Sequence, residues 1–221
     1  MKDIVILGES HTRSFSYRKN ILPFFMGSGK TINLDNIISV NTSIKNVISK
    51  LNKKECLIFL YIGEPNCRYP IKNHWTPHWD EIHKGLDVNP YIDKEYLQNC
   101  IDGYSNINLQ DIDFILTPTG AYDPVQPALH YFKAFKNKVI DIFSKTVDKN
   151  LKTLNKYKAK DWKKDPIHVN SRISEDFLQI LKDKNIINNI EDYKSNVDGY
   201  FGTHLLRTQD KSQFGSYIIK D

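Results

Sequence analysis

IVILGESH, residues 4–11, is the stretch on which the expected fold of this sequence depends. Its four apolar residues run without interruption and end at Gly8, which is the pattern of a short strand buried on both faces of a parallel sheet. Apolar runs of the same kind recur further along the chain. The strands they predict are Ile4–Leu7, Cys56–Ile62, Asp113–Leu116 and Ile167–Ile173.

Helical periodicity occupies the segments between these runs. Apolar residues that recur every three or four positions lie on one face of a helix, which can then cover a sheet. The helices this predicts are residues 37–51, with a cap near Asn41 or Thr42; residues 127–154, the clearest of the three; and residues 177–181, with Ser174 as the cap.

Strands that alternate with helices predict an α/β fold, a three-layer αβα sandwich around an open, mainly parallel sheet. The 221 residues fit one domain, residues 1–221, without repeats or linkers. Residues 64–92, rich in proline, tryptophan and histidine, are expected to form a long loop inserted in that domain. Ligands of such folds bind at the carboxyl ends of the strands.

Composition excludes several classes of function. Hydrophobic residues make up 40% of the chain and aromatic residues 12%, more than a disordered chain carries. The formal net charge is +5, and the densest basic stretch, Lys152–Lys164, has no nucleic-acid motif beside it, so a solvated surface is expected there. The cysteines are too few for a disulfide framework, and no apolar segment is long enough for a signal peptide or a membrane span. We therefore expect a cytoplasmic protein that binds neither nucleic acid nor membranes.

Catalytic chemistry is suggested first by Gly8-Glu9-Ser10-His11, which follows the first strand at once. There Ser10 would be exposed at the sheet edge, and its backbone N–H could bind an oxyanion. A nucleophilic serine needs a base within hydrogen-bond reach. His204, in the glycine-flanked segment GTHL, is the candidate. A capping role for Ser10 and a surface position for His204 remain the alternatives.

GEPNCR, residues 63–68, follows the second strand directly. Asn66 can donate a side-chain N–H to a developing oxyanion, and Arg68 can hold a carboxylate, sulfate or phosphate of a substrate. The structural alternative is a tight turn in which Arg68 pairs with Glu64 or another acid.

Two further clusters do not support a cofactor or a metal. GSGKT, residues 27–31, resembles the end of a phosphate-binding loop, but Phe24 stands where that pattern needs glycine, and Pro23 interrupts ILPFF, the segment that would have to be its strand. Four potential zinc ligands have a spacing that matches no metal motif. These are His74, His78, Asp80 and His83. We expect neither a cofactor nor a metal.

GESH, GEPNCR and GTHL, in this order, resemble the sequence blocks of the SGNH (GDSL-like) hydrolases, and the GE-x-x-CR form resembles a subgroup associated with bacterial surface-glycan genes. The resemblance spans Gly8 to His204 and rests on few residues. It implies a flavodoxin-like fold in which Ser10 is the nucleophile and His204 its base. The further residues it implies for the oxyanion hole or the substrate are Gly27, Gly29, Asn66, Arg68, His11 and Glu64.

The chain departs from the SGNH pattern at three positions. Glu9 replaces the usual aspartate, and Pro65 stands where the family has its asparagine, so that Asn66 comes one position later. Phe201 replaces the acid three residues before the histidine. Either Asp198 orients His204 from a different path, or the site is a Ser-His dyad, or the activity is lost or altered.

The resemblance implies a serine esterase or acyltransferase that acts on O-acyl groups, with a small-molecule or glycan ester as its substrate. A non-catalytic glycan-binding or assembly protein on the same fold is the alternative, supported by Phe201. A third possibility is transfer of a phosphorus-containing group, with Lys30 and Arg68 holding the anion. The oligomeric state stays open.

Overall fold

The computed structural model describes residues 1–15, 18–26, 34–63, 102–118, 138–149, 153–158 and 169–194. Within these ranges, parallel strands form one open five-stranded sheet in the order β2-β1-β3-β4-β5. The strands are β1 (Asp3–Gly8), β2 (Ile21–Phe25), β3 (Cys56–Tyr61), β4 (Phe114–Leu116) and β5 (Val139–Ile140). The open parallel sheet that the sequence predicts is therefore confirmed.

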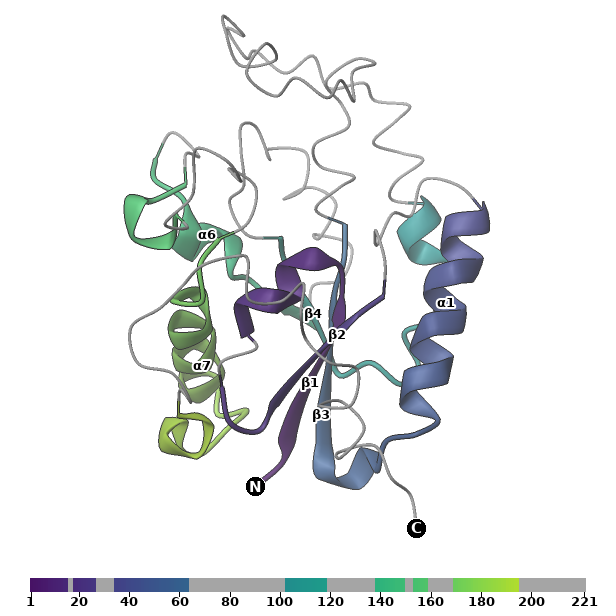
Figure 1. Ribbon diagram of the computed structural model, residues 1–221, viewed down its shortest axis with the longest axis horizontal. Coiled ribbons are helices and arrows are strands. Elements are labelled where there is room, and N and C mark those ends of the chain that lie inside the picture. The colour runs from purple at the N-terminus through teal and green to yellow at the C-terminus, as the bar shows by residue number, and fades with distance from the viewer. Residues whose placement is uncertain are drawn as a thin grey trace, which may run out of the picture.

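Helices cover both faces of this sheet, so the fold has three layers (Figure 1). The α-helices are α1 (Leu34–Ile48), α6 (Phe143–Thr146) and α7 (Ile173–Asp183). The described residues also include short 3-10 helices: η1 (Ser10–Phe15), η2 (Lys53–Glu55), η4 (Asn155–Tyr157) and η5 (Ile190–Tyr193). The helix α1 packs on one face, whereas η1 and α7 pack on the other.

β1 shows why an uninterrupted apolar run suits this position. Successive side chains of a strand point to opposite faces of the sheet. Val5 and Leu7 lie in the core beneath α1, and Ile4 and Ile6 lie in the core beneath α7. All four side chains are fully buried, because both faces of the strand are covered.

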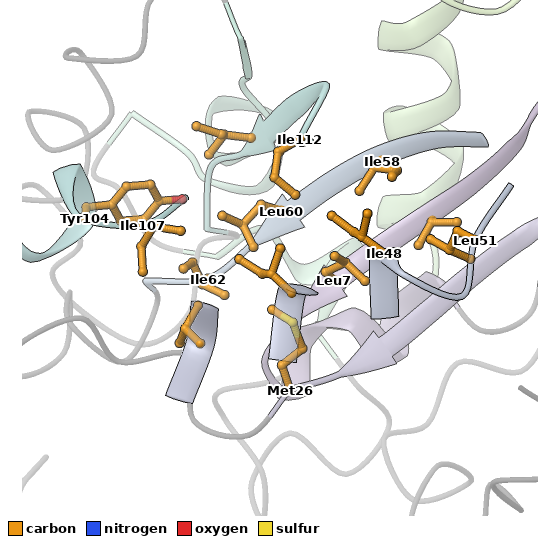
Figure 2. Close-up of a cluster of buried hydrophobic side chains, with 14 of the residues drawn as sticks. Leu7, Met26, Ile48, Leu51, Ile58, Leu60, Ile62, Tyr104, Ile107 and Ile112 are labelled. Carbon is orange, nitrogen blue, oxygen red and sulfur yellow. The ribbon is translucent and has the colours of Figure 1, made fainter. Parts of the chain in front are cut away.

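The core beneath α1 continues toward the carboxyl ends of the strands (Figure 2). Leu7, Ile58 and Leu60 project from the strands into this core, and Ile48 meets them from α1. Three residues from the helical turn at 102–105 and from the segment that leads on to β4 complete this core. These are Tyr104, Ile107 and Ile112.

Three aromatic rings join the layers on the opposite face. Phe177 of α7 is fully buried and meets Phe15 of η1 edge-to-face, with ring centroids 5.2 Å apart. It meets Phe59 of β3 in the same way at 5.3 Å. Such aromatic contacts add to the stabilisation from apolar burial. Phe177 therefore connects the sheet to η1, the element that begins at Ser10.

β2 corrects the expectation that Pro23 prevents a strand at residues 21–25. In a parallel ladder, alternate residues bond to a given neighbour, and the Met26 N–H donates to the Gly8 carbonyl at 2.7 Å. The nitrogen of Pro23, three positions earlier, therefore faces away from β1. Because β2 lies at the edge of the sheet, the missing N–H costs no ladder bond.

The cap expected near Asn41 or Thr42 is wrong, because α1 already begins at Leu34. Asn41 lies inside the helix, where its amide donates to the Asn106 carbonyl at 3.1 Å and accepts from the Asn108 N–H at 2.8 Å. A residue type that favours helix caps is used here to attach a neighbouring loop.

The long helix expected over residues 127–154 is wrong over its described part, from residue 138 on. Val139–Ile140 form β5, α6 is only four residues long, and Thr153 pairs with Val147 in an isolated bridge. The apolar residues of this segment divide between the two cores, with Ile140 on one side and Phe143 on the other. Apolar residues thus recur every three or four positions in this segment although the segment does not form one long helix.

The strand expected over residues 167–173 is also wrong where the structure describes it. Val169 forms one isolated bridge, with Lys158, and Ile173 begins α7. Ser174 lies inside the first turn of α7 and not at its cap. The buried side chain of Asn170 makes the turn before α7, since it donates to the Lys156 and Lys158 carbonyls and accepts from the Arg172 N–H.

Among the helices of the described ranges, none combines the length and the apolar character needed to cross a bilayer.

Replacing Phe177 with alanine is expected to lower the free energy of unfolding by about 3–5 kcal/mol, because a fully buried ring would leave a cavity. Phe25→Ala makes the same chemical change at a side chain that is 67% exposed, and we expect it to cost less than about 1 kcal/mol. Urea unfolding of both variants measures the difference. Equal losses would contradict the role assigned to Phe177.

Candidate functional site

The segment around Ser10 lies at the point where the strand order of the sheet reverses. β1 and β3 are neighbours, but the chain leaves β1 toward β2 on one side and leaves β3 toward β4 on the other. In open α/β sheets with the order 2-1-3-4-5, ligands bind at this switch point, beyond the carboxyl ends of the two strands. Ser10 comes two residues after β1, and Gly63 comes two residues after β3.

Gly8 lets β1 and β3 approach closely at this point. A Cβ atom at position 8 would lie 2.1 Å from the Tyr61 carbonyl oxygen and 2.8 Å from the Thr12 side chain. The first of these neighbours is backbone, which cannot rotate away. Only glycine is compatible with this distance between the strands.

Hydrogen bonds to Glu9 determine where the turn begins. The Glu9 N–H donates to the Tyr61 carbonyl at 3.1 Å, which extends the pairing with β3 by one residue. The Glu9 carbonyl accepts from both the backbone N–H and the hydroxyl of Thr12, at 3.0 and 2.8 Å. Both backbone groups of Glu9 are therefore hydrogen-bonded, and the helix η1 begins at the next residue, Ser10.

Glu9 and His11 form a buried acid–imidazole pair on either side of Ser10 in the sequence. The Glu9 side chain is almost fully buried and the His11 side chain fully so, and Oε1 of Glu9 lies 3.0 Å from Nδ1 of His11. The rings of His11 and Tyr61 are in a T-shaped arrangement, with ring centroids 6.1 Å apart. Burying an acidic group is costly without an ionic or hydrogen-bonding partner, and His11 lies at ion-pair distance from Glu9.

Gly63 has a backbone conformation that other residues avoid. Its φ is 101°, outside the range that residues with a Cβ ordinarily adopt. A residue with a Cβ would be strained at this position, two residues after β3. The sequence shows a glycine after the second predicted strand, but the positive φ is visible only in the structure.

Thr117, at the end of β4, is a buried polar residue that sequence reasoning missed. Its hydroxyl accepts from the Ile142 and Phe143 N–H groups, each at 2.9 Å, and contacts Asp141 Oδ1 at 3.3 Å. These bonds hold the segment after β5 against the sheet. They give Thr117 a structural role, and its TP sequence gave no signal for it.

The segment after α7 is attached at the opposite, amino end of the sheet. The Lys19 N–H donates to the Lys194 carbonyl at 2.9 Å, and the Tyr193 hydroxyl donates to the Lys2 carbonyl at 2.6 Å. Burial raises the pKa of Tyr193 to about 12. Arg18, whose pKa burial lowers, donates to the Tyr193 carbonyl. The chain therefore enters residue 195 from the amino ends of β1 and β2.

The structure thus places Glu9, the backbone of Ser10 and His11 together just after β1, and it describes Gly63 two residues after the neighbouring strand β3. The other candidates lie outside the described residues. These are Gly27, Gly29, Lys30, Glu64, Asn66, Arg68, Asp198 and His204, the loop at 64–92 with its histidines, and residues 127–137.

Comparison with known proteins finds no matching protein-family model and no matching curated protein. Two solved structures show a distant similarity to this chain. One is a "putative acylhydrolase" from Bacteroides fragilis, 14% identical with a TM-score of 0.48, over 84% of this chain and 88% of that one. The other is a GDSL-like lipase from Bacteroides thetaiotaomicron, 15% identical with a TM-score of 0.44, over 84% of this chain and 87% of that one. At such identities the site must be argued from this chain's own residues.

Gly8→Ala is expected to lower the free energy of unfolding by about 1–3 kcal/mol, since the added methyl group overlaps the Tyr61 carbonyl. Gly63→Ala is expected to cost about 1–3 kcal/mol for a different reason, the strain of a positive φ. Chemical denaturation of both variants measures these costs. A Gly8→Ala variant as stable as the wild type would show that β1 and β3 do not approach as described.

Proposed function

We propose that this protein is a serine hydrolase of the SGNH type, an esterase or acyltransferase that acts on O-acyl groups of a carbohydrate. In this proposal Ser10 is the nucleophile and His204 its base. The observation that carries it is the position of the Ser10 backbone, two residues after β1 at the β1–β3 switch point. Gly8, Glu9 and Thr12 hold that backbone in place, which is what a site for acyl transfer requires.

The proposed reaction is acyl transfer through a covalent intermediate. His204 removes the proton of Ser10, whose oxygen attacks the ester carbonyl, and the departing alcohol takes the proton from His204. The Ser10 N–H, the N–H of Gly27 or Gly29, and the Asn66 side chain would stabilise the oxyanion. Water then releases the acid in an esterase, whereas a sugar hydroxyl accepts the acyl group in a transferase.

Chain length supports the pairing of Ser10 with His204. Lys194 is held at the amino end of the sheet, ten residues before His204. Ten residues span at most about 33–36 Å. Ser10 comes seven residues after Asp3, the first residue of β1, which is about 23 Å at roughly 3.3 Å per residue. His204 can therefore reach Ser10 with several residues to spare for a turn.

Asp198 has much less reach as the acid that orients His204. It comes four residues after Lys194, and four residues span at most about 14 Å. An almost fully extended chain would be needed for its carboxylate to meet an imidazole at the carboxyl end of the sheet. If Asp198 is the acid, Asp198→Asn should lower kcat by about 10⁴-fold. A loss below tenfold would indicate a Ser-His dyad.

The carbohydrate part of the proposal rests on sequence. The GE-x-x-CR form resembles glycan-associated relatives, and residues 64–92 include Trp75 and Trp79, whose rings can stack on sugars. Glu64 and Arg68 would contact polar or anionic groups of the glycan. The alternative, a glycan-binding protein without catalysis, draws support from Phe201 in place of the usual acid.

Ser10→Ala and His204→Ala should each lower the kcat/KM for p-nitrophenyl acetate by about 10³-fold or more, because each removes a group that acts in the transition state. Ser39→Ala, the same change at an exposed position of α1, is the matched control and should leave the rate unchanged. Release of p-nitrophenol measures all three variants.

Equal rates for Ser10→Ala and the wild type would remove Ser10 from the mechanism. A fluorophosphonate probe gives an independent reading, since it labels an activated serine. Failure to label Ser10, together with measurable glycan binding, would favour the non-catalytic alternative.

A further inference from the structure

We propose that Phe25 borders the acyl subsite, the part of the proposed site that takes the acyl group of the ester, and makes it prefer aliphatic chains longer than acetyl. The identity of this ligand rests on the proposed function. The position and the exposure of Phe25 are properties of the fold, so binding can test the subsite as well as turnover.

Phe25 lies one strand away from the turn that begins at Ser10. It is the last residue of β2 and pairs in register with Gly8, the last residue of β1. The hydrogen bond from the Met26 N–H to the Gly8 carbonyl, 2.7 Å long, fixes this register. Neighbouring strands lie about 4.8 Å apart, so Phe25 is next to Gly8, and Ser10 follows Gly8 by two residues.

The side chain of Phe25 leaves the sheet on the face that η1 covers. Side chains alternate between the two faces along β2. Leu22 and Met26 lie in the core beneath α1. Ile21 lies in the opposite core, together with Phe15 of η1, and η1 packs against β2. Phe25 comes four residues after Ile21 and therefore points to the same face as Ile21.

Gly8 makes room for the first turn of η1 on this face. A Cβ atom at position 8 would lie 2.8 Å from the side chain of Thr12, which is two residues beyond Ser10. On the far side of Gly8, Tyr61 of β3 is fully buried. On the near side is Phe25, at the edge strand of the sheet. Phe25 therefore borders the turn of Ser10 on the side of the sheet edge.

Burial along this face of β2 ends at Phe25. Ile21 is 3% exposed and Pro23 is also buried, whereas Phe25 is 67% exposed. The other exposed large apolar side chains of the described residues do not lie on strands. These are Met1, Leu34 and Ile38. An exposed aromatic ring beside a turn at the carboxyl ends of the strands is suited to line a ligand site.

The proposed reaction brings the acyl group to this side of Ser10. The ester carbonyl would lie between the Ser10 oxygen and the oxyanion donors, which include the N–H of Gly27 or Gly29. These glycines follow Phe25 by two and four residues. A side chain between the nucleophile and that segment adjoins the acyl part of the ester. Because a phenyl ring offers no hydrogen bond, it favours an aliphatic chain, which gains free energy on leaving water.

We expect the wild type to hydrolyse p-nitrophenyl octanoate with a kcat/KM at least about tenfold above that for p-nitrophenyl acetate, since contact with the ring rewards the longer chain. Phe25→Ala should lower the octanoate value by at least about tenfold and the acetate value by less than about threefold. Phe25→Leu keeps most of the apolar surface and should stay within about threefold of the wild type on both esters.

Ile38→Ala is the matched control. It removes an exposed apolar side chain from α1, on the other face of the sheet, and should leave both rates unchanged. Rates are compared below the micellar concentration of the octanoate ester, with variants that far-UV circular dichroism shows to be folded.

Binding of sodium octanoate, measured by isothermal titration calorimetry, tests the subsite without turnover. Phe25→Ala should bind octanoate at least about fivefold more weakly than the wild type, and Ser10→Ala should bind it within about threefold. Acetate is the control ligand, and its affinity should not depend on Phe25. This result would support an apolar subsite at Phe25 even if Ser10→Ala hydrolysed esters as fast as the wild type, which would remove the proposed function.

Three outcomes would overturn the inference. In the first, Phe25→Ala changes neither the ratio of octanoate to acetate hydrolysis nor the affinity for octanoate, while Ser10→Ala is inactive. This outcome rejects the subsite and keeps the hydrolase. In the second, Phe25→Ala slows hydrolysis of glucose pentaacetate without changing that ratio, which would assign the ring to the sugar. In the third, light scattering shows a wild-type dimer that Phe25→Ala dissociates, which would assign Phe25 to an interface between copies.

Discussion

The close approach of β1 and β3 at Gly8 is the constraint on which the candidate site depends. Because position 8 has no Cβ, the Tyr61 carbonyl comes near enough to accept the Glu9 N–H, and the strand pairing continues one residue beyond β1. The helix η1 then begins at Ser10, two residues after β1, just as Gly63 comes two residues after β3. Hydrogen bonds that pair the strands thus also determine where the serine stands.

Packing around β1 supports this local geometry. The two apolar cores cover both faces of β1, and the ring of Phe177, from α7, contacts both η1 and β3. Within this apolar environment, Glu9 and His11 form a buried acid–imidazole pair, and such pairs cost free energy unless they are well matched. Such a cost is tolerated where a defined position matters, and the neighbouring residue is the proposed nucleophile.

Sequence patterns predicted correctly the strands that are buried on both faces. They were misleading for segments whose structure depends on where they lie in the sheet. The runs ending at Gly8 and Gly63 predict β1 and β3, because a strand covered on both faces has to be apolar throughout. Pro23 argued against β2, yet an edge strand needs no N–H on its outer side. Spacing of three and four residues after residue 138 predicted a helix, although Ile140 and Phe143 face different cores.

The sequence by itself determined the class of the fold, the GES turn after the first strand and the glycine after the second, since these depend on local composition and on the order of motifs along the chain. Only the tertiary structure decided that β1 and β3 are neighbours at a switch point, that Gly8 is required by contact with Tyr61, and that His11 points inward against Glu9. The physical reason is that strand order and side-chain burial depend on which distant segments pack together. A one-dimensional pattern does not contain those distances.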